Sequence, residues 1–267
     1  MITFTSAHLK EGLFRIYERA RRADWRPETD FDWDRPTPLS PDMQRIAWTV
    51  ASQASYAEQL GLLASARLLG QTEDGPARLC LATAVSDEAR HSETFARYAL
   101  RRGGKVLPPD PSIQALRQGL ESVDDFLGLF FVHTALEWLA ADEFTLLARL
   151  FKGDVLGDMY LRVRSDELRH VGMGMLYLRW RLKDRSRTGW DPTPYEQLAL
   201  RLSGFDDRFF AQLGALLRQP PDAVRHWFMS RHQARVRHLL GGKPTQAQRT
   251  PASATCEGSP PGDDAAT

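Results

Sequence analysis

The chain has 267 residues, and its charges nearly cancel, with 35 basic against 34 acidic side chains. This balance argues against a protein held on nucleic acid by bulk charge, and no apolar run approaches the length of a membrane span. The first residues lack the apolar block of a secretory signal, and Cys80 and Cys256 form no C-x-x-C motif. We therefore expect a cytoplasmic protein with no thiolate metal site and no disulfide framework.

Helix signals dominate the first part of the chain. An amphipathic helix is predicted over about residues 7–23, followed by an aromatic, proline-bearing connector from Trp25 to Pro38. Ser40 and Pro41 then have the pattern of a helix N-cap and a first-turn proline. The helix that they open is predicted to run to about Gly70.

Three further long helices are predicted downstream. One begins at Pro76 and stops at Gly103-Gly104, where glycine allows a left-handed C-cap. Another begins at Ser122 and ends before Gly153, and the last runs over about residues 154–185 and stops near Gly189. The segment 107–121 is long enough to cross over a bundle, as a ferritin-like topology requires.

The remaining chain divides into an appendage and a tail. Three shorter helical stretches are predicted within about 191–240, packed on a core bundle of about 40–185. From about residue 241 the composition turns to small and polar residues, which predicts a disordered tail over 241–267. We therefore expect an all-α chain with a single domain over 1–240.

Two copies of one pentad carry the chemistry, one at residues 87–91 and one at 166–170. Each contains Glu-x-x-His, which places a carboxylate and an imidazole on one helix face, one turn apart. Each also has a lone glutamate 30 residues upstream in an apolar helix. Two single glutamates and two Glu-x-x-His motifs form the ligand set of a dinuclear metal site in a four-helix bundle. The predicted ligands are Glu58, Glu88, His91, Glu137, Glu167 and His170.

The residue types favour a particular metal pair. Carboxylates bridge two cations well, and six protein ligands leave coordination positions open. Oxygen-rich ligands with one imidazole per metal and no thiolate favour Fe or Mn over Zn. We expect two Fe ions, or a Mn/Fe pair.

The two single glutamates differ in how clearly the sequence marks them. Glu58 is the only acidic residue between Asp42 and Glu73. Glu137 has Asp142 and Glu143 as neighbours, and we prefer it because its spacing from the following pentad matches that of Glu58.

Other residues are expected around the ligands. Asp87 and Asp166 lie four residues before their own pentad histidine and can accept a hydrogen bond from its free ring nitrogen. Arg90 and Arg169 can neutralise these buried aspartates. His133, one turn before Glu137, is either an extra ligand, a base beside the metals, or a satisfied core residue. A substrate cavity is expected to be lined by four large apolar residues, although helical spacing also fits plain core: Phe130, Phe131, Met173 and Met175.

Residues 40–185 resemble the ferritin-like non-haem di-iron carboxylate proteins through these two D-E-x-R-H pentads. The motif resembles the oxygen-activating branch, which includes acyl-carrier-protein desaturases, bacterial multicomponent monooxygenases and N-oxygenases. The chain departs from some members of the family. Val163 stands where certain arylamine N-oxygenases have a third histidine, and Phe95 stands near the expected radical tyrosine of ribonucleotide reductase small subunits, with Tyr98 two turns after His91.

The resemblance implies a di-iron oxidase or oxygenase that uses O₂ to hydroxylate, desaturate or N-oxidise an organic or carrier-bound substrate. It implies an external electron donor such as a ferredoxin or reductase, an acyl or peptidyl carrier protein as a further candidate partner, and a homodimer. Two alternatives stay open: an iron-oxidising or peroxide-scavenging protein like ferritin or rubrerythrin, and a small subunit that generates a radical. The Cys-rich module usual in rubrerythrins is missing from the sequence.

Overall fold

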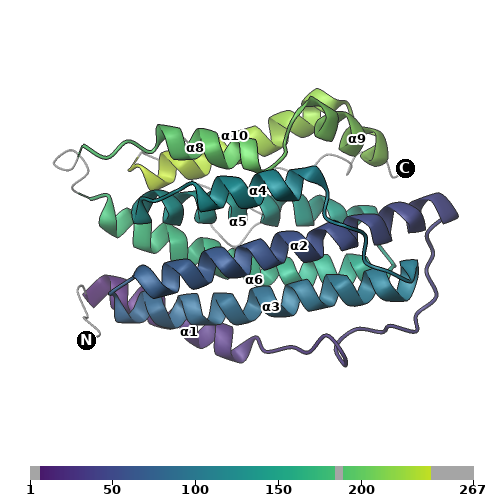
Figure 1. Ribbon diagram of the computed structural model, residues 1–267, viewed down its shortest axis with the longest axis horizontal. Helices are drawn as coiled ribbons and strands as arrows, with labels where there is room; N and C mark the ends of the chain where they lie inside the picture. Colours follow the sequence, from purple (N-terminus) through teal and green to yellow (C-terminus); the bar gives the residue numbers. More distant parts are fainter. Residues whose placement is uncertain (1–6, 184–188, 242–267) are drawn as a thin grey trace, which may run out of the picture.

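The computed structural model describes residues 7–183 and 189–241, and over these residues the chain is helical (Figure 1). The predicted all-α class is confirmed. The helices are α1 (Ala7–Arg22), α2 (Pro41–Gln71), α3 (Gly75–Gly103), α4 (Pro111–Glu121), α5 (Phe126–Leu150), α6 (Val155–Arg181), α8 (Thr193–Leu202), α9 (Asp207–Leu217) and α10 (Pro221–Leu239).

Local sequence signals explain most of the helix ends. The Ser40 hydroxyl accepts a hydrogen bond from the Met43 backbone N–H, and Pro41 occupies the first turn of α2. At the end of α3, Gly104 takes a left-handed φ of 71°, which glycine adopts without steric cost. The Asp154 carboxylate caps α6 by accepting from the Leu156 N–H. These predicted helix ends are confirmed.

The predicted start of the third long helix was wrong. Ser122 is the C-cap of α4, and α5 begins at Phe126 after the N-cap Asp125, which accepts from the Gly128 N–H. The segment expected only to cross the bundle holds a helix of its own, because Asp110 and Pro111 form a cap and first-turn pair. Helix α6 ends at Arg181, and residues 184–188 lie outside the described chain.

Four long helices form the bundle. Helices α2 and α3 pack along their lengths, as do α5 and α6, and the two pairs meet through α3 against α6 and α2 against α5 (Figure 1). Helix α1 lies against α3 and α6 on one side, and α4 and α8 cover α2 and α5 on the other. The pentad helices therefore face each other inside the bundle.

Two apolar clusters seal the middle of the bundle from opposite ends. Along α5, the buried apolar residues of 129–139 belong to one cluster, and those of 144–151 belong to the other except Leu146, which packs with residues of α9 and α10. Along α6, residues 155–163 and 173–182 divide in the same way. The second pentad, 166–170, falls between the two clusters, so its polar side chains lie in a layer closed above and below by apolar packing.

The C-terminal helices are tied to the bundle through α5. Asp142 is 1% exposed and pairs with Arg231 and Arg235 of α10. The Trp138 indole N–H donates to His232 Nδ1 over 3.1 Å. These contacts place α8–α10 on the bundle, whereas the predicted disordered tail lies in residues outside the described chain, apart from residue 241, and stays a prediction.

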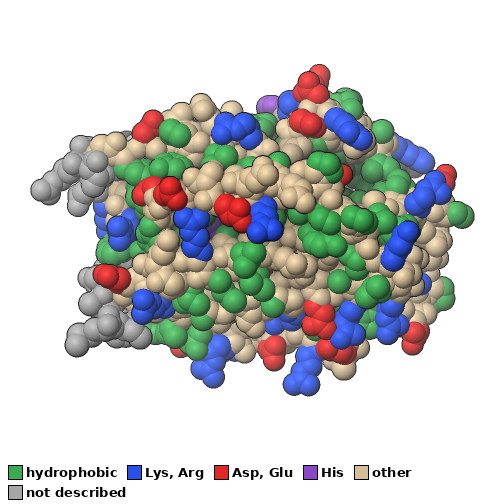
Figure 2. Space-filling model, viewed as in Figure 1, with side chains coloured by type: hydrophobic (Ala, Val, Ile, Leu, Met, Phe, Trp, Pro, Cys, Tyr) green, Lys and Arg blue, Asp and Glu red, His purple; other side chains and the backbone are tan. Residues whose placement is uncertain are grey.

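The outer surface carries mixed charge. Figure 2 shows acidic and basic side chains interspersed on the visible face, with no large area of one sign. Within 7–183 and 189–241, no helix has the length and apolar character needed to cross a membrane.

Candidate metal centre

The six predicted ligands converge from four helices into one buried cluster. Each of these residues is at most 7% exposed. Their donor atoms form two overlapping groups, and the atoms of each group lie within 4.8 Å of one another. Glu88 and Glu167 belong to both groups. The first group adds Glu58 and His91, and the second adds Glu137 and His170.

Both imidazoles turn the same nitrogen toward the carboxylates. His91 Nδ1 lies 3.1 Å from a Glu167 oxygen and 3.4 Å from a Glu58 oxygen. His170 Nδ1 lies 3.2 Å from a Glu88 oxygen and 3.3 Å from a Glu137 oxygen. Each histidine therefore meets carboxylates from both halves of the bundle, so the cluster depends on the packing of α2–α3 against α5–α6.

The donor set fits a pair of cations. Glu88 Oε1, Glu167 Oε1 and His91 Nδ1 are buried yet make no hydrogen bond, whereas buried polar atoms are nearly always bonded. Burial and the charge of Glu167 raise the pKa of Glu88 well above its usual value, and the same two causes raise the pKa of Glu137 to about 7. Bound cations would relieve this repulsion and give the unbonded atoms partners.

The second nitrogen of each histidine binds an aspartate from the opposite pentad. His91 Nε2 lies 3.1 Å from Asp166, and His170 Nε2 lies 3.2 Å from Asp87. The expected pairing within one pentad was wrong. Each imidazole directs Nδ1 into the cluster and extends across to the facing helix, so its far nitrogen reaches that helix rather than its own.

Two arginines complete this crossed arrangement. Arg90 donates to Asp87 over 2.5 Å and to Asp166 over 3.0 Å. Arg169 donates to Asp87 over 3.0 Å and also to Asp166. Burial raises the pKa of Asp166, but the hydrogen bond and charge of His91 outweigh it, so the net pKa lies well below its usual value. The predicted neutralisation of both aspartates by arginine is therefore present in the structure.

Trp25 also contacts this arrangement, and the sequence did not single it out as a functional residue. Its indole N–H donates to Asp166 over 2.9 Å, and its ring stacks on His91 with centroids 6.1 Å apart. The Arg90 guanidinium lies 4.5 Å from the Trp25 ring centre. The aromatic connector before α2 was the only available signal, because nothing in its spacing relates Trp25 to Asp166.

The environment of Glu137 distinguishes it from its neighbours. His133 Nε2 lies 3.2 Å from Glu137 and 2.7 Å from the Ser65 hydroxyl, and burial lowers the pKa of His133, which favours its neutral form. His133 lies outside both donor groups. Asp142 pairs with α10 arginines, and Glu143 lies farther along α5. Glu137 is thus the α5 carboxylate that the fold brings to the cluster.

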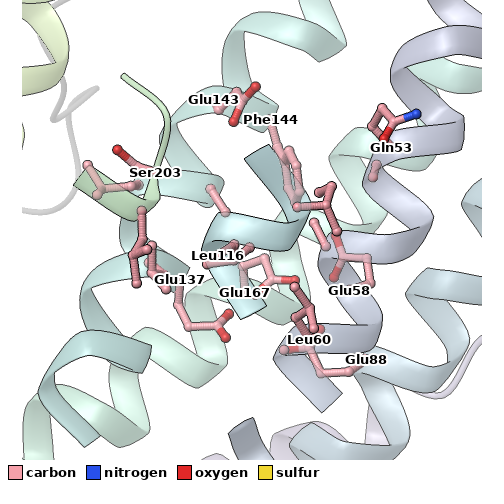
Figure 3. A pocket seen from close by; sticks show the side chains of 18 of the residues that line it. Gln53, Glu58, Leu60, Glu88, Leu116, Glu137, Glu143, Phe144, Glu167 and Ser203 are labelled. Atoms are coloured by element: carbon pink, nitrogen blue, oxygen red, sulfur yellow. The ribbon is translucent and has the colours of Figure 1, made fainter. Parts of the chain in front are cut away.

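A cavity of about 260 Å³ opens beside the cluster. Figure 3 shows the carboxylates of Glu58, Glu88, Glu137 and Glu167 on one side of it, with that of Glu143 apart from them. Most of the remaining wall is apolar and comes from α2, α4 and α5, including Leu60, Ile113, Leu116, Leu136 and Phe144. The cavity is therefore an apolar space with one strongly polar side.

The four residues expected to line a substrate pocket lie outside this cavity, and their role stays a prediction. Phe130 stacks on Tyr177, Phe131 packs against Trp138, and Met173 is buried in the same apolar cluster. Met175 is partly buried against that cluster. None of the four lines the cavity described here, because they face the apolar layer at one end of the ligands.

Gly61 allows the close approach of α2 to Glu88. A Cβ atom at this position would lie 2.8 Å from a Glu88 carboxylate oxygen, which is too short for an ordinary contact. Gly61 is one turn after Glu58 and lines the cavity. The absence of a side chain here gives room for Glu88, one of the two carboxylates that both donor groups share.

Known structures share this fold. No protein-family model matches the chain, and no curated protein matches it. A variant of an R2-like ligand-binding oxidase with an aerobically reconstituted Mn/Fe cofactor matches with 19% identity and a TM-score of 0.64, over 84% of this chain and 92% of the other. Another variant with an Fe/Fe cofactor matches with 19% identity and a TM-score of 0.65, over 84% and 91%.

A further match is a putative class I ribonucleotide reductase from Bacillus halodurans, with 12% identity and a TM-score of 0.68, over 86% of this chain and 92% of the other. At these identities the similarity concerns the fold. Together with the buried Glu and His cluster, it confirms the expected architecture: the chain has the ferritin-like helical bundle fold of these neighbours.

Proposed function

We propose that the chain is an oxidoreductase that holds two metal ions, Fe/Fe or Mn/Fe, and uses O₂ to oxidise an organic molecule. The observation that carries this proposal is the apolar cavity whose polar side consists of the cluster carboxylates. A site that only stored metal would need a polar path for entering ions. An apolar wall beside the ligands instead suits an organic substrate.

The protein's own residues would hold the metals and the substrate. The four glutamates and the Nδ1 atoms of His91 and His170 would be the ligands, and the crossed aspartates would fix the orientation of both imidazoles. When bound, such a pair supplies the electrons and the coordination site for O₂ reduction. The apolar wall would limit water near the cluster and position one bond of the substrate.

Two rival functions receive less support. A radical-generating subunit would need a tyrosine near the cluster at the place of Phe95, which is buried against Phe144 and Tyr160. Tyr98 is engaged with Asp154 over 2.9 Å. A minimal iron store would not require the cavity cover that α4, the end of α8 and the α8–α9 connection provide through Leu116, Leu202 and Phe205.

The reaction type can be tested by aerobic addition of Fe(II) to the metal-free protein. We expect uptake to saturate at about two ions per chain, measured by metal analysis after gel filtration. Oxygen consumption by the loaded protein should then rise when a substrate from a panel of amines, alcohols and acyl compounds is supplied with an external reductant. The control is Glu121→Gln, which alters an exposed carboxylate paired with Arg117 and should change neither result.

Accumulation of many ferric ions per chain without any substrate would contradict the proposal and favour an iron store. A single tightly held Zn, with no uptake of Fe or Mn, would contradict the dinuclear oxidoreductase itself.

A further inference from the structure

Two polar side chains of the cavity wall lie outside the ligand cluster and have no hydrogen-bond or ion-pair partner within residues 7–183 and 189–241. One is Tyr160 of α6, which is fully buried and whose hydroxyl makes no hydrogen bond to another described residue. Its ring is held by Phe95 and Phe144, each with centroids 5.2 Å away. Because the ring is fixed by this packing and the residue lines the cavity, its hydroxyl is available to a molecule inside.

The second side chain is Glu143 of α5, whose carboxylate lies apart from the four cluster carboxylates in Figure 3. It forms no hydrogen bond or ion pair with another described residue. Burial and the nearby charge of Glu58 raise the pKa of Glu143 to about 7. Glu143 and Tyr160 line the same cavity, and burial and then the charge of Glu143 raise the pKa of the Tyr160 hydroxyl.

The other polar groups of the wall are already engaged. Gln53 donates to the Pro108 carbonyl and accepts from the Asp110 N–H. The Ser203 hydroxyl donates to the Leu200 carbonyl, and His133 contacts Ser65 and Glu137. Glu143 and Tyr160 are therefore the wall's unused polar groups beyond the cluster.

The charge of the wall selects the kind of ligand. Among the described residues, no lysine or arginine lines the cavity, so a carboxylate ligand could pair only with the metal ions of the cluster and would be repelled by the charge of Glu143. Two divalent metal ions would balance the four cluster glutamates, which leaves Glu143 as the uncompensated charge. A buried charge is stabilised by a paired, hydrogen-bonded opposite charge. An ammonium group, with its three N–H donors, supplies both.

We propose that Glu143 and Tyr160 bind the amino group of the substrate, which is a small amine whose remaining part is apolar. The Glu143 carboxylate accepts from the ammonium group and pairs with its charge, and the Tyr160 oxygen accepts a second hydrogen bond. The apolar part lies along the wall toward the cluster. The proposal rests on the proposed function, because it takes the cavity as the substrate site.

Three probes of equal chain length separate the possible polar ends: n-octylamine, 1-octanol and octanoate. Binding to the metal-loaded protein is measured by isothermal titration calorimetry without O₂, so that no turnover occurs. We expect n-octylamine to bind at least about tenfold more tightly than 1-octanol, because hydrogen bonds to charged groups are the strong ones. Octanoate can pair only with the metals, so replacing Glu143 should not lower its affinity.

Substitutions assign the effect to the two residues. Glu143→Gln keeps the side-chain size. It should lower the affinity for n-octylamine by about tenfold to a hundredfold and change the affinity for 1-octanol by no more than about threefold. Tyr160→Phe should lower the affinity for n-octylamine by a smaller factor. The controls are Glu11→Gln, an exposed α1 carboxylate paired with Arg15, and Tyr177→Phe, a buried tyrosine outside the cavity. Neither should change binding.

Binding of 1-octanol as tight as that of n-octylamine to the unaltered protein would overturn the proposal, and this result does not depend on any variant folding. Equal binding of n-octylamine to Glu143→Gln and the unaltered protein would overturn it as well. The metal content is measured separately on the same samples. Failure to load two metals would defeat the proposed function, whereas Glu143-independent amine binding in fully loaded protein would defeat the amine site alone.

Discussion

The α2–α3 half of the cluster and the α5–α6 half contribute the same ligand types in different surroundings. Each supplies one glutamate and one Glu-x-x-His, and each aspartate orients the histidine of the opposite half. Around His91, the Trp25 ring stacks on the imidazole and its N–H binds Asp166. Around Glu137, His133 and Ser65 form a buried hydrogen-bonded pair instead.

This difference shows that the two metal positions are chemically unequal although their ligands match. The residues that distinguish them come from the connector before α2 and from single positions on α2 and α5, none of which is part of the repeated pentad. Outer residues of this kind tune metal affinity and reactivity. We therefore expect the two positions to respond differently to substitutions outside the ligand set.

The largest effect should come from removing a ligand that both halves share. Glu167 belongs to both donor groups, whereas Glu58 belongs to one. Glu167→Ala should therefore abolish binding of the metal pair, and Glu58→Ala should lower the metal content to about one weakly held ion per chain. Metal analysis of both variants after Fe(II) loading measures this difference.

Glu93→Ala on α3 is the matched control, because this exposed glutamate pairs only with Arg97 among the interactions that the structure gives it. If Glu167→Ala retained one tightly held ion while Glu58→Ala lost both, the two carboxylates would have the reverse roles, and the shared position of Glu167 would be wrong.

An intermediate effect should come from the aspartates. Asp166 accepts from Trp25, His91 and both arginines, whereas Asp87 accepts from His170 and the arginines. Asp166→Asn should weaken metal binding by about a hundredfold, and Asp87→Asn by about tenfold, within the range usual for such partners. Competition against a coloured chelator gives both affinities. Equal losses of metal affinity in the two variants would mean that the hydrogen bond from Trp25 to Asp166 does not strengthen metal binding.

The ligand cluster was predictable because helix geometry links spacing to position. Glu-x-x-His fixes a carboxylate and an imidazole on one face, and the matching 30-residue offsets identified Glu58 and Glu137 within apolar helices. Three of the four long helices also had an end that the sequence marked with a cap, namely Ser40 for α2, Gly104 for α3 and Asp154 for α6. Periodic local signals of this kind survive in the folded chain because tertiary packing uses the same faces.

What could not be predicted depends on contacts between helices. The crossed pairing of Asp87 with His170 requires knowledge of how α3 faces α6. The cavity wall includes Leu202 and Ser203 from the end of α8, and no local pattern relates them to Glu58. Phe130 and Met173 are residue types that often line pockets. That they face the apolar core depends on how α5 and α6 are rotated about their axes, which the sequence does not reveal.

The smallest effect should come from Trp25, and it would show whether the connector makes the two halves unequal. Trp25→Phe keeps a ring able to stack near His91 but removes the N–H that donates to Asp166. Asp166 would retain His91, Arg90 and Arg169 as donors, so the loss should be only a few-fold in metal affinity. In Mössbauer spectra of the diferrous protein, the signal of one iron site should change and that of the other should stay the same.

Trp33→Phe is the matched control in the same connector, because the Trp33 N–H donates to the Pro27 carbonyl and contacts no ligand. A change of both iron sites by Trp25→Phe, or an equal change by Trp33→Phe, would mean that the connector acts on the bundle as a whole and not on the His91 side.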